Sequence, residues 1–404
     1  MRACLLLLVL AGSAAADKPE PADEAPPSLW KRKGGEDWPR FLGPRGDSTS
    51  AEKGLVVPWP KDGPRVAWHK PLGIGYSMPT VDRGRLFVFD RVRNRCRLRA
   101  LNAEDGETLW TFEYATAYRD KYGYNGGPRC SPVVDGPRVY AFGPEGMLHC
   151  VNARDGKVVW KVDTEKEFGV IQNFFGVGST PVVEGDLLLV QVGGSPKGSD
   201  ETPFDELKAN GTGMVAFDKR TGKVKWKALD ELASYSSPVL ATVGKRRLCL
   251  LLGRGGLHAL DPRTGKAEGS FPWRANMLES VNASNPVVVG ERVLISECYQ
   301  IGAAWLDIKP GGGFKPLWTD KEKGRRKRLA THWMTPVVVD GYAYGSSGRH
   351  ENEAELRCVE LATGTVMWSE KGLTRTSLLH VDGHFVCLGE DGTLLLLKAG
   401  PKKY

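Results

Sequence analysis

Aromatic, amide and cationic side chains recur in the segments that lead into successive apolar stretches of this sequence. Such groups can stack on a flat ring and hydrogen-bond to its substituents, so together they could form a pocket for a sugar, a quinone or a peptide. Each of these residues is also common in loops that have no binding role, and that interpretation remains open. The candidates are Tyr76, Ser77, Tyr122, Tyr124, Asn125, Arg129, Asn173, Phe174, Tyr235, Ser236, Asn282, Asn285, His332, Trp333 and Arg375.

Two histidines, His380 and His384, flank an Asp-Gly turn, so their imidazoles could approach one another across paired strands as a metal pair. No third ligand stands nearby, and we therefore predict no metal site. The sequence also contains no G-x-S-x-G, H-E-x-x-H, P-loop or dinucleotide-binding motif. The sequence therefore identifies no catalytic residue.

None of the 8 cysteines is adjacent to another, and none forms a C-x-x-C pair. Neither a zinc framework nor a c-type haem attachment is predicted. An odd number remains after the predicted signal peptide, which implies a free thiol or an intermolecular bond in an exported protein. We expect most of these thiols to be buried: Cys96, Cys130, Cys150, Cys249, Cys298, Cys358 and Cys387.

One sequence motif recurs along the chain. It begins with an apolar residue, followed two positions later by Ala or Cys and then by Asp, Asn or Glu. Thr-Gly or Asp-Gly comes next, and a Trp follows the glycine. Small residues suit closely packed sheets, glycine suits a tight turn, and Trp offers a large packing face. We therefore assign a structural role to Gly106, Gly156, Gly222, Gly265, Gly364, Trp68, Trp110, Trp160, Trp226, Trp273, Trp318 and Trp368.

A second phrase precedes each copy: a small or polar residue, Pro, two apolar residues and a turn such as Asp135-Gly136 or Glu184-Gly185. Each unit is thus predicted to form four short strands, and its sequence has no helical periodicity. Repeats of roughly 40 to 50 residues with four strands are typical of propeller blades. The predicted fold is an all-β propeller of four-stranded antiparallel blades.

Seven tryptophans end a unit, and seven phrases open one, so seven blades are predicted. Residues 64–68 resemble an isolated fourth strand, and the last unit, near Leu378, lacks its own. We expect this N-terminal strand to join the C-terminal blade and close the ring. Eight blades remain an alternative because the interval from Trp160 to Trp226 is the longest.

The N-terminus carries one basic residue, a short apolar run and small residues up to Ala16, which predicts a signal peptide over 1–16 and a periplasmic or secreted protein. No later run approaches the roughly 18 apolar residues of a membrane span, and no lipid-anchor motif is present. Residues 17–37 have the composition of a flexible leader. A single propeller domain is then expected over 38–404.

The formal net charge is +8, and basic residues are spread along the chain. One dense cluster could bind an anionic surface or a nucleic acid, but a solvated loop is the preferred interpretation, and no nucleic-acid partner is predicted. The cluster contains Lys321, Lys323, Arg325, Arg326, Lys327 and Arg328.

These repeats resemble the pyrroloquinoline-quinone (PQQ) repeat superfamily over nearly all of residues 38–398, and Trp38 to Gly46 is similar to an N-terminal signature of exported bacterial PQQ-like proteins. Quinoprotein dehydrogenases of this superfamily hold PQQ over calcium, often with a disulfide of adjacent cysteines. Another relative is the propeller subunit of the outer-membrane β-barrel assembly machine, which binds proteins and no cofactor. The chain lacks the adjacent cysteines of the enzymes and the lipid anchor of the subunit.

We therefore expect a non-catalytic exported propeller that binds a protein or polysaccharide of the cell envelope, without a cofactor. The alternative is a PQQ- and calcium-dependent or atypical oxidoreductase acting on an alcohol or sugar at the candidate residues. A sensor domain working with a separate signalling partner is a third interpretation. The sequence indicates no oligomeric state.

Overall fold

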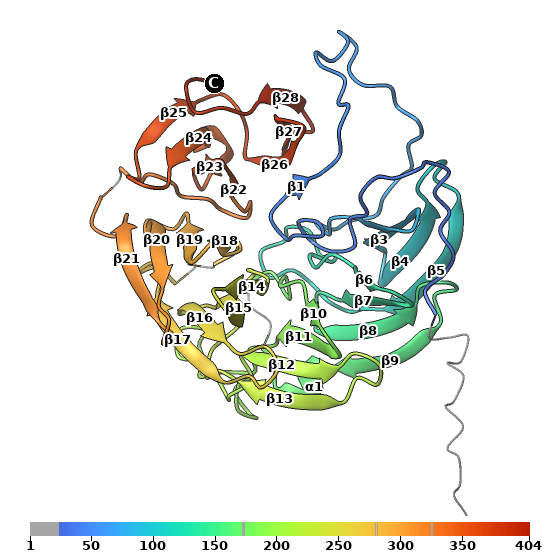
Figure 1. The fold of residues 1–404 in the computed structure, drawn as a ribbon. Coiled ribbons are helices and arrows are strands. Elements are labelled where there is room, and N and C mark those ends of the chain that lie inside the picture. Colours follow the sequence, from blue (N-terminus) through green and yellow to red (C-terminus); the bar gives the residue numbers. More distant parts are fainter. Residues whose placement is uncertain (1–23, 172–173, 279, 281, 325) are drawn as a thin grey trace, which may run out of the picture.

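The computed structural model describes residues 24–171, 174–278, 280, 282–324 and 326–404. Within these residues, seven four-stranded sheets stand around a central axis as the blades of a propeller (Figure 1). The blades follow one another around the ring in chain order. The predicted all-β propeller with seven blades is confirmed, and the eight-blade alternative is not.

Six blades are each built from four consecutive antiparallel strands, with the first strand innermost. Blade 1 contains β2 (Thr80–Asp82), β3 (Arg85–Val92), β4 (Arg95–Asn102) and β5 (Thr108–Ala115); blade 2 contains β6 (Val133–Asp135), β7 (Arg138–Phe142), β8 (Met147–Asn152) and β9 (Val158–Asp163); blade 3 contains β10 (Val182–Glu184), β11 (Leu187–Gln191), β12 (Met214–Asp218) and β13 (Val224–Ala228).

The second half of the ring repeats this arrangement. Blade 4 contains β14 (Val239–Val243), β15 (Arg246–Leu252), β16 (Gly256–Leu260) and β17 (Ala267–Pro272); blade 5 contains β18 (Val287–Val289), β19 (Arg292–Glu297), β20 (Gly302–Ile308) and β21 (Phe314–Thr319); blade 6 contains β22 (Val337–Val339), β23 (Tyr342–Ser347), β24 (Glu355–Glu360) and β25 (Val366–Glu370).

Blade 7 is assembled differently. Its strands β26 (Thr376–Val381), β27 (His384–Gly389) and β28 (Leu394–Lys398) are joined by β1 (Thr49–Ser50), which runs parallel to β26 at the inner edge. Residues 64–68, which we expected to supply the outer strand, form no strand. That expectation is wrong, because the N-terminal strand of this sheet comes from 49–50 and pairs at the opposite edge.

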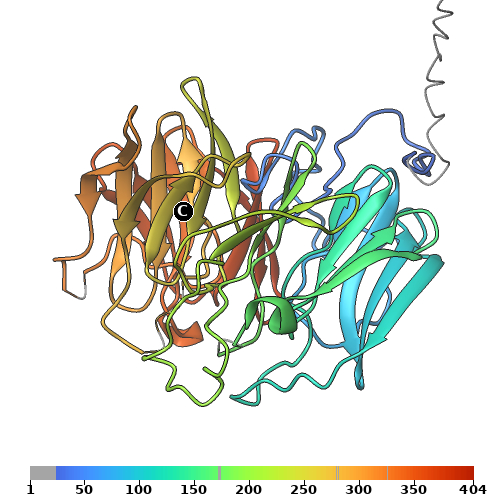
Figure 2. The same ribbon diagram turned by 90° about the horizontal axis from the view of Figure 1, so that it is seen from below.

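Alternating strand directions divide the connections between two faces of the disc. One face carries the links from each outermost strand to the next blade and the links between second and third strands, and we call it the loop face. It includes the α-helix α1 (Thr164–Phe168) and the 3-10 helix η2 (Glu351–Glu353). Figure 2 shows these long loops and α1 on one side of the disc. The opposite side, with the tight hairpins, is the turn face.

Blades pack on one another through the repeated tryptophan. The ring of Trp110, in the outermost strand of blade 1, covers Gly156 of blade 2, and its indole N–H donates to the Ala153 carbonyl at 3.1 Å. Trp68 covers Gly106 in the same way, with its N–H 3.1 Å from the Ala103 carbonyl. Residues 64–68 thus contact blade 1 as an outer strand of blade 7 would, although they are not paired with β28.

Two more contacts between blades follow this pattern, whereas the contacts made by the outermost strands of blades 4 and 5 depart from it. Trp160 covers Gly222 and Trp226 covers Gly265. In β17, however, Gly269 occupies the position of the tryptophan, against Gly313 of blade 5, and Trp273 lies after the strand, 1% exposed. Trp318 of blade 5 keeps the hydrogen bond to the Leu361 carbonyl, but Arg328 lies between its ring and Gly364. Trp368 of blade 6 donates to the Gly400 carbonyl.

The N-terminal segment crosses the inside of the ring. Trp38 forms a bridge with Val81 of blade 1, Pro39 accepts a hydrogen bond from the Val134 N–H of blade 2, and Ser48 accepts one from His380 of blade 7. Residues 40–46 lie against the innermost strands of blades 3 and 4 and leave a space of only about 20 Å³ there. Figure 1 shows this blue segment inside the ring beside β26.

The described part of the expected leader, 24–37, contacts blade 1. Arg85 donates to the Pro27 carbonyl at 2.6 Å, and the Leu29 N–H donates to the Arg83 carbonyl at 2.9 Å. The predicted signal peptide lies outside the described residues. None of the helices in the described ranges has the length and hydrophobicity needed to cross a membrane.

All seven cysteines that follow the predicted signal peptide are buried and carry free thiols. Burial raises the pKa of the Cys96 and Cys150 thiols to about 12. Small thiols therefore fill the sheet interior between blades, as expected for most of them.

The tryptophan contact predicts different effects for two glycine substitutions. Gly156 and Gly185 both have positive φ, at 73° and 55°, but an added Cβ at Gly156 would lie 2.5 Å from the Trp110 ring, whereas at Gly185 it would meet nothing within 4 Å. Gly185→Ala should lower the free energy of unfolding by about 1 kcal/mol through the backbone alone. Gly156→Ala should lower it by about 1–3 kcal/mol more because of overpacking. Equal losses in urea unfolding would contradict this role of the glycine.

The buried His149 predicts a loss of stability in acid. Its ring lies between blades 1 and 2, 4.5 Å from Tyr114 and 5.0 Å from Phe112, and burial lowers its pKa to about 4. In the unfolded chain His149 is protonated below about pH 6.5, whereas in the folded protein it stays neutral down to about pH 4. The free energy of unfolding therefore falls as the pH decreases from 6.5 to about 4, by up to about 1.4 kcal/mol per pH unit. His149→Phe should flatten this slope in urea unfolding at several pH values; an unchanged slope would refute the assignment.

Candidate functional site

The candidate residues gather on the loop face in two clusters, with several others buried beneath them. Asn173 lies outside the described residues. We call the first group the aromatic cluster: Tyr76, Tyr122, Tyr124, Arg129, Phe174, Phe175 and Tyr235. We call the second the His332 cluster: Tyr299, His332, Trp333, Arg349, Arg375 and Glu390.

A buried ion pair anchors the aromatic cluster. Arg129 and Asp120 lie 2.9 Å apart, and their side chains are only 11% and 2% exposed. The guanidinium of Arg129 also lies 5.3 Å from the ring centre of Tyr76 and 5.8 Å from that of Phe175. These separations are within the range of cation–π attraction. The charge of Arg129 is therefore used to hold aromatic rings in place.

Three tyrosines of this cluster are open to solvent. Tyr76, Tyr122 and Tyr124 are 60%, 53% and 71% exposed. Tyr122 lies 5.7 Å and Tyr124 5.9 Å from the half-buried ring of Phe175. Asn125 supports their loop, because its side-chain oxygen accepts a hydrogen bond from the Gly127 N–H at 2.9 Å. The result is an exposed aromatic surface on a fixed support.

The floor of the aromatic cluster comes from other blades. The Tyr235 hydroxyl accepts a hydrogen bond from the Phe175 N–H at 2.7 Å, and burial raises the pKa of this phenol. Phe174 packs on Phe204 with ring centres 4.1 Å apart, and the Arg254 guanidinium lies 3.6 Å above the Phe204 ring. The cluster thus spans residues of blades 1 to 4.

The His332 cluster is organised around one neutral imidazole. The Tyr299 hydroxyl lies 3.0 Å from His332 Nε2, and an Arg375 N–H lies 3.3 Å from His332 Nδ1. Because a guanidinium can only donate, Nδ1 accepts and Nε2 carries the proton. Burial, followed by the charges of Arg375 and Arg349, lowers the His332 pKa to about 3. At neutral pH this histidine is a hydrogen-bonding spacer and carries no charge.

Arginines flank the imidazole on the loop face. Arg375 makes two hydrogen bonds to the Glu390 carboxylate, at 2.8 and 2.6 Å, and covers the ring of Trp333 at 3.9 Å. Arg349 lies 4.6 Å from the Tyr299 ring centre. Trp333 remains 46% exposed despite these contacts.

Sequence reasoning missed Asp120, Phe175 and Phe204 in the first cluster and Tyr299, Arg349 and Glu390 in the second. Most of these residues lie between the second and third strands of a blade, whereas the candidates were sought only in segments leading into innermost strands. Antiparallel alternation brings both kinds of connection to the same face. Applying that rule would have found Phe204, Tyr299, Arg349 and Glu390.

Asn285 and Asn282 have structural partners. The residue before proline in successive blades forms a belt around the axis: Ser131 N–H donates to the Thr180 hydroxyl, Thr180 to Ser237, Ser237 to the Asn285 amide oxygen, and Asn285 to Thr335, at 2.8–3.0 Å. Asn282 is 1% exposed and donates to the Gly253 carbonyl at 2.7 Å. Ser77 and Ser236 are also covered, with hydroxyl oxygens buried.

The histidine pair does not meet. His380 pairs with Phe385, and His384 pairs with Val381, so neighbouring register positions place the two imidazoles on opposite faces of the sheet. No group of three or more His, Cys, Asp or Glu side chains within the described ranges could hold a metal ion. The cysteines of the described residues are separate free thiols, so the adjacent disulfide of quinoprotein enzymes has no counterpart among them.

The basic segment after β21 matches a solvated loop. Lys321, Lys323 and Arg326 are exposed, while Arg328 pairs with Asp320 at 3.1 Å and Lys327 donates to the Asp320 carbonyl. Arg325 lies outside the described residues. Two residues of this cluster, Lys327 and Arg328, are therefore engaged in holding its own loop.

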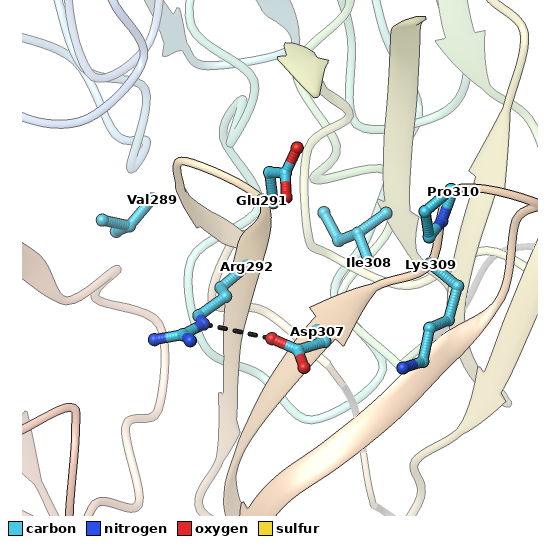
Figure 3. A pocket seen from close by; sticks show the side chains of 7 residues that line it. All are labelled: Val289, Glu291, Arg292, Asp307, Ile308, Lys309 and Pro310. Carbon is cyan, nitrogen blue, oxygen red and sulfur yellow. Dashed lines mark hydrogen bonds and ion pairs between the residues drawn. The ribbon is translucent and has the colours of Figure 1, made fainter. Parts of the chain in front are cut away.

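A broad concavity of about 510 Å³ lies on the turn face, between the hairpins of blade 5 (Figure 3). It includes none of the candidate residues. Its one ion pair joins Arg292 and Asp307 at 3.1 Å, with side chains 50% and 32% exposed, and exposed pairs of this kind contribute little stability. The lining residues are Val289, Glu291, Arg292, Asp307, Ile308, Lys309 and Pro310.

The belt predicts that Thr180→Val is destabilising although it conserves shape. Removal of the hydroxyl leaves the buried Ser131 N–H without its acceptor, which should lower the free energy of unfolding by about 1–3 kcal/mol. Thr108→Val, at an exposed position of β5, is the matched control and should change it by less than about 0.5 kcal/mol. Equal effects in urea unfolding would mean that the belt contributes no stability.

Comparison with known proteins places this geometry in context. A 274-residue match to outer membrane protein assembly factor BamB of Moranella endobia is 22% identical and covers 66% of this chain and 64% of that protein. The dehydrogenase subunit of a quinone-dependent alcohol dehydrogenase from Gluconobacter oxydans is 26% identical over 40% of this chain but only 20% of its own length. The chain therefore spans slightly under two thirds of the first relative and one fifth of the second.

A solved structure and a family model agree with the propeller. The crystal structure of BamB from Moraxella catarrhalis superposes with a TM-score of 0.54 at 15% identity, covering 80% of this chain and 82% of that one, which supports the fold. A family model described as outer membrane protein assembly factor BamB matches residues 29–121 and 94–370. This chain therefore belongs to the family of PQQ-like repeat propellers described by the name BamB.

Proposed function

We propose that this chain is an exported, non-catalytic propeller that binds an envelope protein through the aromatic cluster on its loop face. The observation that carries the proposal is the set of three tyrosines, each more than half exposed, around the buried Arg129–Asp120 pair. Tyrosine and arginine are enriched at the energetic centres of protein interfaces. The predicted signal peptide supports a location outside the cytoplasm.

Rigidity is the physical reason that this surface suits a partner. A tyrosine loses little conformational entropy on binding because it has only two side-chain torsions. Arg129 and Asp120 hold the loop that carries Tyr122 and Tyr124, and the Phe175 backbone is tied to Tyr235. Much of the ordering is thus present before a partner arrives, which favours affinity.

The kind of partner follows from the relatives. Their name places them in the assembly of outer membrane proteins, and the chain shares their family and fold. We therefore propose a protein of outer-membrane assembly as the partner, with this chain acting as a scaffold. No catalytic step is assigned to any of its residues.

A double variant tests this surface. Tyr122→Ala with Tyr124→Ala should weaken binding of the mature chain to the periplasmic region of the source organism's outer-membrane assembly protein by about tenfold or more, because truncating interface anchors typically removes 2 kcal/mol or more. Biolayer interferometry measures the affinity. Val289→Ala with Lys309→Ala, in the turn-face concavity of Figure 3, is the control and should change it by less than about twofold.

The outcome decides which face binds. Unchanged affinity in the tyrosine variant would refute the aromatic cluster as the interface, and a loss confined to the Val289 and Lys309 variant would assign binding to the turn face. Complete absence of binding by the wild-type chain would refute the proposed partner.

The quinoprotein alternative has one supporting observation, the partial match to the Gluconobacter oxydans dehydrogenase subunit. Titration with PQQ and calcium, followed by absorbance and calorimetry, separates the two functions. The proposed scaffold predicts no saturable binding. Saturation near one equivalent, lost on substitution of His332, Trp333 and Arg129, would replace the scaffold with an oxidoreductase.

A further inference from the structure

The His332 cluster has an excess of positive charge beside an exposed indole. Arg375 is neutralised by its two hydrogen bonds to Glu390, and His332 is neutral at physiological pH. Arg349 stacks on Tyr299 but forms no ion pair with any residue in the described part of the chain. One cationic group of the cluster therefore remains available to an anion.

The cluster is built from several blades and is held rigidly. Tyr299 follows β19 of blade 5, His332 and Trp333 precede β22 of blade 6, and Arg375 precedes β26 of blade 7. Arg375 also donates to the Arg349 backbone carbonyl at 2.9 Å, which ties the Arg349 loop to the next blade. The Arg349 backbone is thus tied to Arg375, the same side chain that covers the indole of Trp333.

Trp333 supplies an apolar surface next to this charge. Nearly half of the side chain is exposed although Arg375 covers its ring at 3.9 Å. The exposed part of the indole offers an apolar surface on which the apolar face of a ring can pack. A ligand that uses both Arg349 and Trp333 carries a carboxylate and a ring with an apolar face.

We propose that the His332 cluster binds a uronic acid residue of an acidic polysaccharide. The sugar carboxylate accepts hydrogen bonds from the guanidinium of Arg349, because both groups are planar and match in geometry. The C–H face of the sugar ring lies on Trp333. In a uronate both groups are fixed on one rigid ring, so binding orders few torsions. An aspartate or glutamate side chain also offers a carboxylate but has no ring with an apolar C–H face beside it, and it would leave Trp333 unused.

The proposal is independent of protein binding by the aromatic cluster, because the two clusters share no residue. The positive net charge of the chain, +8, also favours approach of a polyanion. A chain that binds a partner protein at one cluster and an acidic polysaccharide at the other would act as a link between them.

Calorimetry with trigalacturonate at 150 mM NaCl tests the proposal, with maltotriose as the uncharged sugar and triglutamate as the acidic peptide. We expect saturable binding of trigalacturonate only. Arg349→Gln and Trp333→Ala should each weaken it by about tenfold or more, as expected for loss of a charged hydrogen bond or a stacking surface. Arg326→Gln, which makes the same charge change on an exposed loop, and Tyr124→Ala, in the aromatic cluster, should change it by less than about twofold.

Several results would overturn the proposal. Absence of trigalacturonate binding, equal binding of triglutamate, or unchanged affinity in Arg349→Gln would each do so. Thermal unfolding checks that the variants are folded, and Trp333→Phe, which keeps a flat ring, should retain most of the affinity if Trp333→Ala loses it. None of these outcomes depends on the assembly-protein assay, so the two proposals stand or fall separately.

Discussion

The contact between a tryptophan of one blade and a turn glycine of the next is the constraint on which this propeller depends. Gly156 has positive φ and no side chain, so the ring of Trp110 can lie directly on its backbone. The indole N–H then satisfies a carbonyl that would otherwise be buried without a donor. Blades 1 to 3 each present one such ring and one such glycine, so each of them is completed only by its neighbours.

A second set of contacts holds the blades around the axis. The belt that runs from Ser131 to Thr335 joins five consecutive blades through side-chain oxygens that stand before the prolines. It does not continue into blade 1, which has Met78 at the corresponding position, or into blade 7, where β1 adds a parallel strand at the inner edge. The N-terminal segment contacts this sector through the Trp38–Val81 bridge and the pairing of β1 with β26, and it also lies against the inner strands of blades 3 and 4.

Neither of these two constraints involves the exposed aromatic side chains of the loop face. Loops there are anchored by a few polar contacts, such as the buried pair of Arg129 with Asp120 and the partly exposed pair of Arg375 with Glu390. The anchors hold Tyr122, Tyr124 and Trp333 in exposed positions. The turn face, in contrast, is mostly made of tight hairpins, and the glycines between third and fourth strands, such as Gly156 and Gly222, serve the packing between blades.

The all-β class, the seven blades and the tryptophan packing could be determined from the sequence alone, because Gly and Trp recur at a spacing within single hairpins, and hairpin geometry is local. The tertiary structure decided what local spacing cannot specify. It placed β1 at the inner edge of blade 7, left 64–68 without a strand, and set Gly269 in place of a tryptophan. It also brought Arg375 to His332 and Phe204 to Phe174, since such pairs depend on how loops from different blades converge around a closed ring.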